Sequence, residues 1–140
     1  MILLDTNVVS EPLRPAPEAR VIEWIDAQPL ETLYLSAMTV AELRAGVALL
    51  PAGKRRTNLH EYLEKRVLPM FAGRVLPFDL ACTSAYAELL AKVRKAGSGM
   101  ETADACIAAV AFANGFTVAT RDMSPFQLAG LTVINPWEEG

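Results

Sequence analysis

The 140-residue chain contains a single histidine and two cysteines, so several common kinds of active site have little material to be built from. A Ser-His-Asp triad or a histidine-driven ribonuclease would depend on His60, which lies in the segment LHEYLEK and is expected on a helix surface. Cys82 and Cys106 are far apart and form no CxxC pair, which argues against a zinc site or a disulfide framework. The sequence also lacks a P-loop and a GxGxxG motif, so no nucleotide site is indicated.

Long apolar runs and an excess of basic charge are missing as well. No run approaches the roughly 18 apolar residues of a membrane span, and the start MILLDTN lacks the features of a signal peptide. The net charge of −3 argues against binding of nucleic acid through overall charge, so such a partner would need a local basic patch or metal ions. With 52% hydrophobic residues, the chain is expected to form one cytoplasmic globular domain over residues 1–140, without membrane contact.

Short apolar runs alternate with longer segments that have helical spacing. The runs suit strands buried on both faces, and they occupy residues 2–4, 32–36, 74–78, 116–120 and 131–135. Helices are predicted between them, with Pro17 in a first turn, over residues 17–28, 38–50, 56–73, 80–97 and 101–115. Alternating strands and helices predict an α/β fold, a three-layer α/β/α domain around a parallel sheet.

Polar side chains follow three of the predicted strands. Asp5 comes directly after the first strand, Ser36 ends the second, and Thr120, Arg121 and Asp122 follow the fourth. In open α/β sheets, ligands bind outside the carboxyl ends of the strands. These side chains are therefore expected at one rim of the sheet.

Four acids stand out by their positions: Asp5, Glu42, Asp104 and Asp122. Asp104 shares the apolar stripe of its helix with Ile107, and Glu42 also lies in a mainly apolar segment. Because burying an isolated carboxylate is costly, each of these two should be paired, hydrogen-bonded or bound to a metal. Coincidence of four such acids at one edge points to a functional site.

Each acid also has an ordinary structural interpretation. Thr39 and Glu42 match a helix capping box, as do Ser98 and Glu101, where the capping role is the favoured interpretation. The remaining alternatives are an ion pair of Asp104 with Arg44 or Arg121, a turn role for Asp122, and a helix cap for Asp5.

Carboxylates brought together repel one another unless cations intervene. Hard oxygen ligands without His or Cys favour Mg²⁺ or Mn²⁺ over zinc. A metal in such a site lowers the pKa of bound water, orients a phosphate and neutralises the leaving oxygen, which suits phosphodiester hydrolysis. A phosphatase of the haloacid dehalogenase type would need an acid at position 7, where this chain has Asn7.

The stretches MILLDTNVVSE, TVAELRAG, TADACIAA and TVATRDMSPF, with a closing NPW, resemble the PIN-domain ribonucleases. More narrowly, the sequence is similar to the VapC toxins of bacterial toxin–antitoxin pairs, in the FitB-like branch. The resemblance spans the whole chain. It implies a PIN fold with about five parallel strands and an Mg²⁺- or Mn²⁺-dependent endoribonuclease.

The resemblance also assigns roles to residues. The four acids would be Asp5, Glu42, Asp104 and Asp122, acting as catalytic residues and metal ligands. The polar residues that support them would be Thr6, Asn7, Ser36 and Thr120. Many relatives have T-R-N-x-x-D-F, whereas this chain has Asp122 at the position of the Asn and Pro125 at the position of the acid. Asp122 is therefore alternatively a residue that holds a water beside the metal.

Family resemblance further implies a homodimer and a cognate antitoxin. The antitoxin would cover the acidic groove and would bind operator DNA itself. An alternative function is a catalytically weak module that scaffolds an antitoxin on operator DNA. Candidate RNA contacts are Arg14, Arg44, Arg121 and the run Lys54-Arg55-Arg56, although for this run a solvated loop is the favoured interpretation.

Overall fold

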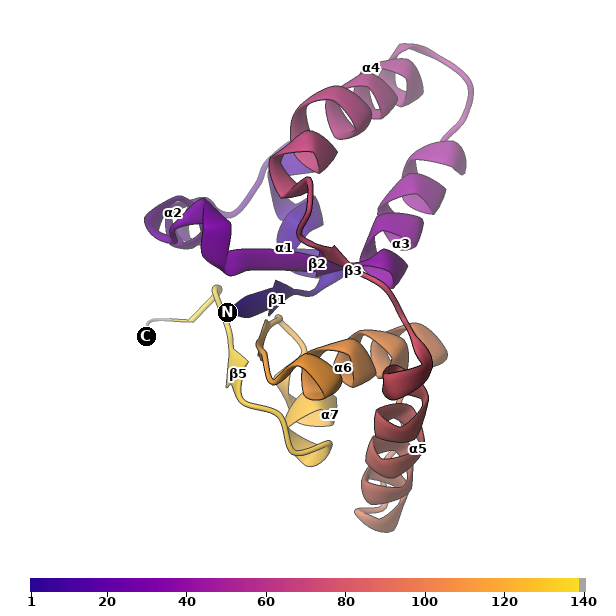
Figure 1. Cartoon of the computed structure of the whole chain (residues 1–140). Coiled ribbons are helices and arrows are strands. Elements are labelled where there is room, and N and C mark those ends of the chain that lie inside the picture. Colours follow the sequence, from indigo (N-terminus) through magenta and orange to yellow (C-terminus); the bar gives the residue numbers. More distant parts are fainter. Residues whose placement is uncertain (139–140) are drawn as a thin grey trace.

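A computed structural model describes residues 1–138. Five parallel strands form one sheet in the order β3-β2-β1-β4-β5 (Figure 1). Their bounds are β1 Ile2–Leu4, β2 Leu33–Ser36, β3 Val75–Leu76, β4 Thr117–Ala119 and β5 Val133–Ile134. The central strand β1 pairs with β2 through Ile2 and Leu33 and with β4 through Ile2 and Thr117. The predicted parallel α/β sheet is confirmed, and all five strands lie within the runs predicted for them.

Helices connect the strands on both faces of the sheet. The α-helices are α1 Thr6–Ser10, α2 Ala19–Ala27, α3 Ala37–Ala48, α4 Lys54–Tyr62, α5 Leu80–Lys95, α6 Thr102–Asn114 and α7 Met123–Leu128. Shorter helical turns are η1 Glu11–Leu13, η2 Leu30–Thr32, η3 Leu63–Val67 and η4 Leu68–Phe71. Within these described residues, no helix is long and apolar enough to cross a membrane.

The core is divided by the sheet into two parts. Leu3 packs with α5, α6 and α7, whereas Leu4, the next residue, packs with α1, α3 and η3 on the other face. Successive residues of a strand point to opposite faces, so the run Ile2–Leu4 serves both layers. The three-layer arrangement (Figure 1) is therefore confirmed, with β1 and its terminal Asp5 at its centre.

Several predicted elements differ in detail. The helix predicted over 56–73 begins earlier, at Lys54, and continues as the π-helical η3 and the 3₁₀-helical η4. Pro69 cannot donate a backbone hydrogen bond, which suits it to the tighter final turn. Pro17 precedes α2, whose N-cap is Glu18. The strand β3 lies at the sheet edge with Val75 exposed, so burial on both faces was a wrong expectation there.

Both capping boxes are wrong. The side chain of Ser36 caps α3 by accepting a hydrogen bond from the Thr39 backbone N–H at 3.0 Å, which places Thr39 inside the helix. The helix α6 begins after Glu101, which occupies the N-cap position itself and makes no side-chain cap hydrogen bond. Glu42 is therefore not required as a helix-start residue, and its carboxylate is available for another role.

Candidate metal centre

Asp5 lies at the carboxyl end of β1 with an exposed fraction of 4%. Its Oδ1 accepts a hydrogen bond from the Thr6 backbone N–H at 2.8 Å, which caps α1, and its Oδ2 accepts one from the Thr120 hydroxyl at 2.8 Å. Burial raises the pKa of this carboxyl, the two hydrogen bonds oppose that rise, and the charges of Glu42 and Asp122 add to it. Asp5 thus caps a helix, as its structural interpretation predicted, and also lies at the rim of the sheet.

Glu42 faces α1 from the second turn of α3. The Thr6 hydroxyl donates to Glu42 Oε1 at 2.6 Å, and it also lies 3.3 Å from the Thr39 hydroxyl. The Ser36 hydroxyl lies 3.2 Å from that of Thr39, so a chain of hydroxyl groups runs from the end of β2 to Glu42. Ser36 and Thr39 are fully buried. This chain fixes the rotamer of Glu42 relative to Asp5.

Asp104 occupies the first turn of α6 and is half-buried. Partial burial, followed by the negative charges of Asp5, Glu42, Glu101 and Asp122, raises the pKa of its carboxyl to about 6. The influence of three other candidate acids on one group shows that the four acids lie in one neighbourhood. Ile107, which follows it by three residues, is fully buried as the helical stripe predicted.

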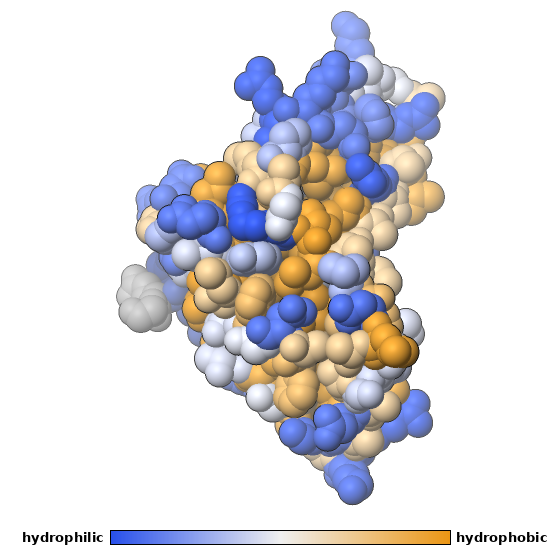
Figure 2. Space-filling model, viewed as in Figure 1, coloured by the Kyte–Doolittle hydropathy of each residue, from blue (hydrophilic) through white to orange (hydrophobic). Residues whose placement is uncertain are grey.

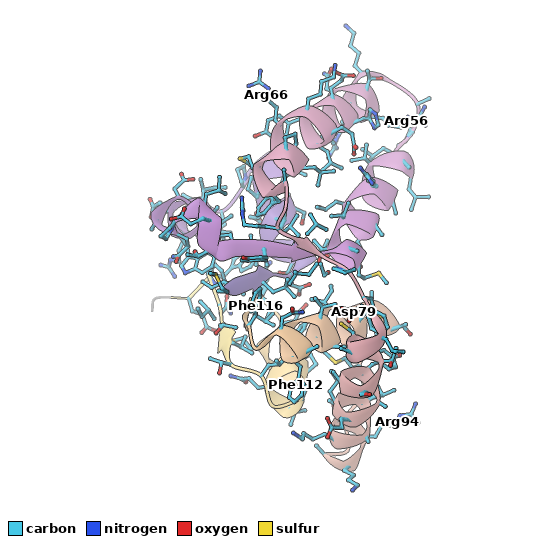
Figure 3. The ribbon with its side chains drawn as sticks, in the orientation of Figure 1. Arg56, Arg66, Asp79, Arg94, Phe112 and Phe116 are labelled. Atoms are coloured by element: carbon cyan, nitrogen blue, oxygen red, sulfur yellow. The ribbon has the colours of Figure 1, made fainter. Side chains whose placement is uncertain are left out.

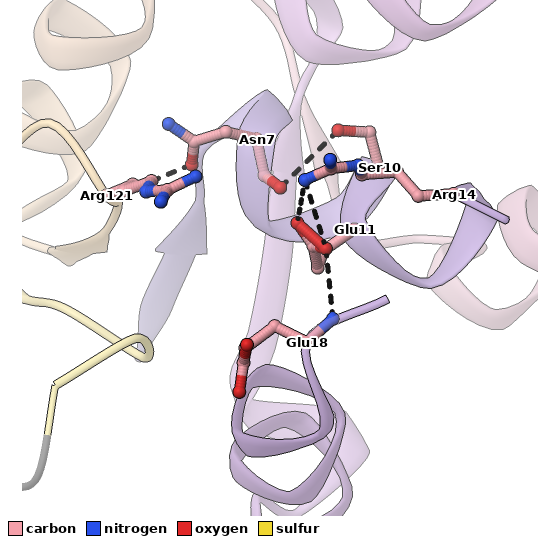
Figure 4. A network of polar contacts seen from close by, with 6 residues as sticks. All are labelled: Asn7, Ser10, Glu11, Arg14, Glu18 and Arg121. Carbon is pink, nitrogen blue, oxygen red and sulfur yellow. Dashed lines mark hydrogen bonds and ion pairs between the residues drawn. The ribbon is translucent and has the colours of Figure 1, made fainter. Parts of the chain in front are cut away.

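Asp122 is exposed and lies at the N-cap of α7 without a side-chain cap hydrogen bond. Its backbone N–H donates to the Thr120 hydroxyl oxygen at 3.1 Å, and Asn7 Nδ2 approaches the same oxygen at 3.5 Å. The Asn7 Oδ1 in turn accepts from the Arg121 backbone N–H at 3.4 Å (Figure 4). Thr120, which is fully buried, therefore joins the segment of Asp122 to Asp5.

The proposed ion pairs of Asp104 with arginine do not form within residues 1–138. Arg44 instead makes two hydrogen bonds to the carboxylate of Glu64, at 2.8 and 3.1 Å. The Arg121 guanidinium lies 5.2 Å from the centre of the Trp137 ring. Asp104 is therefore surrounded by negative charge without a neutralising arginine.

The other basic candidates have different environments. Arg14 donates to the buried carboxylate of Glu11 at 2.9 Å, and Glu11 also accepts from the Glu18 backbone N–H (Figure 4). This network holds the turn between α1 and α2, which contains residues 11–15. The run Lys54-Arg55-Arg56 forms the first turn of α4, where Lys54 and Arg55 are exposed and Arg56 is half-buried.

Two supporting residues were missed by sequence reasoning. Thr39 was interpreted as a helix cap, although its hydroxyl belongs to the chain that reaches Glu42. Asn135 was not considered, yet its Oδ1 accepts from the Trp137 backbone N–H at 2.9 Å and its Nδ2 approaches the Arg121 carbonyl at 3.5 Å. The closing NPW segment, which contains Asn135 and Trp137, was the only sign in the sequence that Asn135 has a supporting role.

The donor set fits a divalent cation. All four acids carry the hard oxygen atoms that such a cation prefers. Asp104, whose pKa is raised first by burial, also lies in the negative field of the other three, which a cation would neutralise. In the part of the chain that the structure describes, no three His, Cys, Asp or Glu side chains already converge as a metal cage. The acids are grouped without being converged, as carboxylates that repel one another are expected to be.

Comparison with known proteins agrees with this fold. The family model described as PIN domain matches residues 2–130. The chain is 72% identical to plasmid stability protein StbB of Pseudomonas syringae pv. tomato and 59% identical to VapC ribonuclease Y4jK of Sinorhizobium fredii, in each case over 99% of both chains. It is 53% identical to toxin FitB of Neisseria gonorrhoeae over 99% of this chain and 100% of FitB.

Solved structures give the same result. The crystal structure of FitAcB from Neisseria gonorrhoeae superposes with a TM-score of 0.96 at 53% identity, covering 99% of this chain and 100% of the other. A structure of FitAB bound to an IR36 DNA fragment gives 0.97 at 51% identity, covering 100% and 98%. The chain therefore belongs to the PIN-domain family, among relatives that include VapC ribonucleases and FitB toxins.

Proposed function

We propose that this protein is the toxin of a toxin–antitoxin pair and acts as an endoribonuclease that hydrolyses RNA phosphodiester bonds. PIN-domain ribonucleases generally depend on divalent metal ions, and the acids of this chain suit that dependence. The observation that carries the proposal is the grouping of Asp5, Glu42, Asp104 and Asp122. Burial, and after it the negative charges of neighbouring acids that include the other three, raises the pKa of Asp104 to about 6.

In this proposal the four acids hold Mg²⁺ or Mn²⁺ as metal ligands. The bound ion would lower the pKa of a water and stabilise charge on the departing oxygen. Asp5, the buried carboxylate, and Asp104, which is half-buried and has a raised pKa, contribute the central ligands. Asp122 is the exposed member, so it contributes either a direct ligand or a hydrogen bond to a metal-bound water.

The supporting residues orient these carboxylates before substrate arrives. Thr120 donates to Asp5 and accepts from the Asp122 backbone, so one hydroxyl fixes two of the acids. Thr6 donates to Glu42 and is itself held against Thr39. Preorganised ligands reduce the rearrangement needed during reaction, which is a large part of how such sites accelerate hydrolysis.

An antitoxin partner follows from the relatives. The similar structures include FitAcB and FitAB complexes, the latter with DNA. For this chain we propose a cognate antitoxin that covers the acidic groove and carries the contact with operator DNA. The homodimer expected from the family resemblance stays a prediction.

The activity is tested by incubating purified protein with structured RNAs and with Mg²⁺, Mn²⁺ or a chelator. Wild type should cleave RNA only with metal. The control Asp26→Asn should behave in the same way, because Asp26 is an exposed residue of α2 and is not one of the four acids. Asp5→Asn, the same change at the rim, should reduce cleavage to the background. Equal cleavage by Asp5→Asn and wild type would contradict the four-acid assignment.

The alternative function is a catalytically weak module that scaffolds an antitoxin on operator DNA. The observation in its favour is that a similar FitAB complex has been solved with DNA. The same experiment separates the two, since the module requires intact wild-type protein to leave every RNA uncut under all metal conditions.

A further inference from the structure

The charge of this acidic chain is distributed very unevenly. Residues 44–66, which we call the basic arm, contain six of the 13 Lys and Arg residues but only two of the 16 Asp and Glu residues. The formal net charge of the basic arm is therefore +4, whereas the rest of the chain carries −7. Figure 2 shows strongly hydrophilic residues gathered over the outer part of this arm, around α4.

The basic arm extends directly from the candidate metal centre. It begins within α3, at Arg44, two residues after Glu42. The chain then returns through α4 and η3, so that the arm forms a helical hairpin that rises from the sheet (Figure 1). Leu43, Val47, Leu63 and Val67 bury its base in the core, and Arg44 binds Glu64 across the hairpin. Because α3 rises by about 1.5 Å per residue, the inner part of the arm lies within two helical turns of Glu42.

A cavity opens inside this arm, between α3 and α4. Its volume is about 540 Å³, within the range of small-molecule sites, and it is lined by Arg44, Val47, Arg56, Thr57, His60 and Leu63, among others. The lining also includes Glu64, which binds Arg44, so the cavity offers an apolar wall together with the Arg56 guanidinium and the His60 imidazole. A nucleotide has this combination of an apolar sugar and base with an anionic phosphate.

Arg56 is the cation in this cavity that lacks a partner. It is half-buried, and it makes no hydrogen bond or ion pair with any of the described residues. Figure 3 shows it on the side of α4 toward the α3–α4 connection, while Arg66 of η3 lies on the opposite side of the arm. A partly desolvated guanidinium without an anion is well suited to receive a phosphate from a ligand.

We propose that the basic arm is the RNA-binding surface of this nuclease and that its α3–α4 cavity is a nucleotide subsite outside the cleavage site. Arg56 holds a backbone phosphate there, and the exposed Lys54 and Arg55 bind neighbouring phosphates. The proposal rests on the proposed ribonuclease function. It supplies what the acidic centre lacks, since grouped carboxylates repel phosphate and cannot provide affinity for the RNA beyond the metal.

The test compares two triple variants that change the net charge equally. Lys54→Gln, Arg55→Gln and Arg56→Gln alter the basic arm, whereas Lys92→Gln, Arg94→Gln and Lys95→Gln alter the last turn of α5, at the opposite end of the molecule (Figure 3). Each triple lowers the formal net charge from −3 by the same three charges. Binding of a fluorescein-labelled single-stranded RNA is measured by anisotropy in an Asp5→Asn background, at several salt concentrations.

The arm triple should weaken RNA binding by about tenfold or more. It should also reduce the slope of log K against log salt concentration by about 2 in magnitude, since each phosphate contact on a single strand contributes about 0.7 to that slope. The α5 triple should bind as the parent does. In the Asp5-containing protein, the arm triple should raise KM for RNA cleavage with little change in kcat.

Unchanged RNA affinity in the arm triple, or an equal loss in both triples, would overturn the proposal. An arm triple that keeps RNA affinity but loses binding of the cognate antitoxin would also overturn it, and would assign the arm to a protein partner. These outcomes are distinct from failure of the ribonuclease function, which would appear as uncut RNA with the wild-type protein in every metal.

Discussion

The Thr120 hydroxyl donates to Asp5 Oδ2 at 2.8 Å across 115 positions of the sequence, and its oxygen accepts from the backbone of Asp122. This contact joins the ends of β1 and β4, which are neighbours in the sheet. Thr120 is thus the residue through which sheet pairing controls the separation of two of the four acids.

Replacing Thr120 by valine should therefore disturb the site with little change in volume. Loss of the buried hydroxyl should lower the free energy of unfolding by about 1–3 kcal/mol, because Asp5 loses a donor. It should also weaken Mn²⁺ binding by about ten- to a hundredfold. Calorimetric titration with Mn²⁺ measures this effect, and Thr83→Val, which removes an exposed helical hydroxyl, is the matched control. Equal Mn²⁺ affinity in both variants would contradict the role of Thr120.

Thr6 should act as a positioning residue for Glu42. Thr6→Val removes the 2.6 Å hydrogen bond and should lower kcat for RNA cleavage by about tenfold or more, whereas Thr6→Ser keeps the hydroxyl and should restore most of the rate. Steady-state kinetics at saturating metal separate kcat from KM. If serine and valine were equally impaired, the methyl group and not the hydroxyl would be the important feature.

The pH dependence of stability should report Asp104. Its pKa in the folded protein is raised to about 6 from an ordinary value of 3.8, so the folded state binds this proton more tightly than the unfolded state does. The contribution of Asp104 to the free energy of unfolding must then become less favourable as the pH rises through this window, and must recover as the pH falls.

Asp104→Asn removes this dependence. In the presence of a chelator, the variant should be more stable than wild type near pH 7, and the difference should shrink as the pH is lowered toward about 4. Urea unfolding of both proteins at a series of pH values measures this difference in the free energy of unfolding. A difference that stays constant over this range would show that Asp104 is not destabilised by its neighbours.

The Arg121–Trp137 contact should couple the closing NPW segment to the loop that carries Asp122. A double-mutant cycle with Trp137→Leu and Arg121→Gln should give a coupling energy of about 0.5–1 kcal/mol, the usual value for an exposed cation–π pair. Trp137→Phe should retain part of it because an aromatic face remains. Strictly additive effects on the free energy of unfolding would mean that the contact carries no energy.

Much of the sheet could be predicted because short apolar runs end at abrupt polar residues. Ile2, Leu3 and Leu4 followed by Asp5 mark both a buried strand and its functional end, and the same holds for β4 and Thr120. Parallel topology then brings these ends to one rim. The short helix α7 was missed, since Pro125 inside a six-residue segment gives almost no helical periodicity.

The contacts that organise the site depend on tertiary structure and so escaped prediction. Thr39 and Glu42 have the spacing of a capping box, yet Ser36 provides the cap and Thr6, 36 positions away from Glu42, provides its hydrogen bond. Arg44 was considered as a partner for an acid at the rim, but Glu64 of η3, on the other side of the helical hairpin, binds it. Local spacing therefore placed the helix start wrongly, because the packed fold decides which side chains meet.

The central claim is that these grouped carboxylates form a divalent metal site, and thermal unfolding with increasing Mn²⁺ tests it most directly. A ligand that binds only the folded state stabilises it by about 2.7 kcal/mol at a hundred times its Kd, so the melting temperature of wild type and Asp26→Asn should rise with Mn²⁺. Asp5→Asn should show a much smaller rise. No rise in wild type, or an equal rise in Asp5→Asn, would contradict the account.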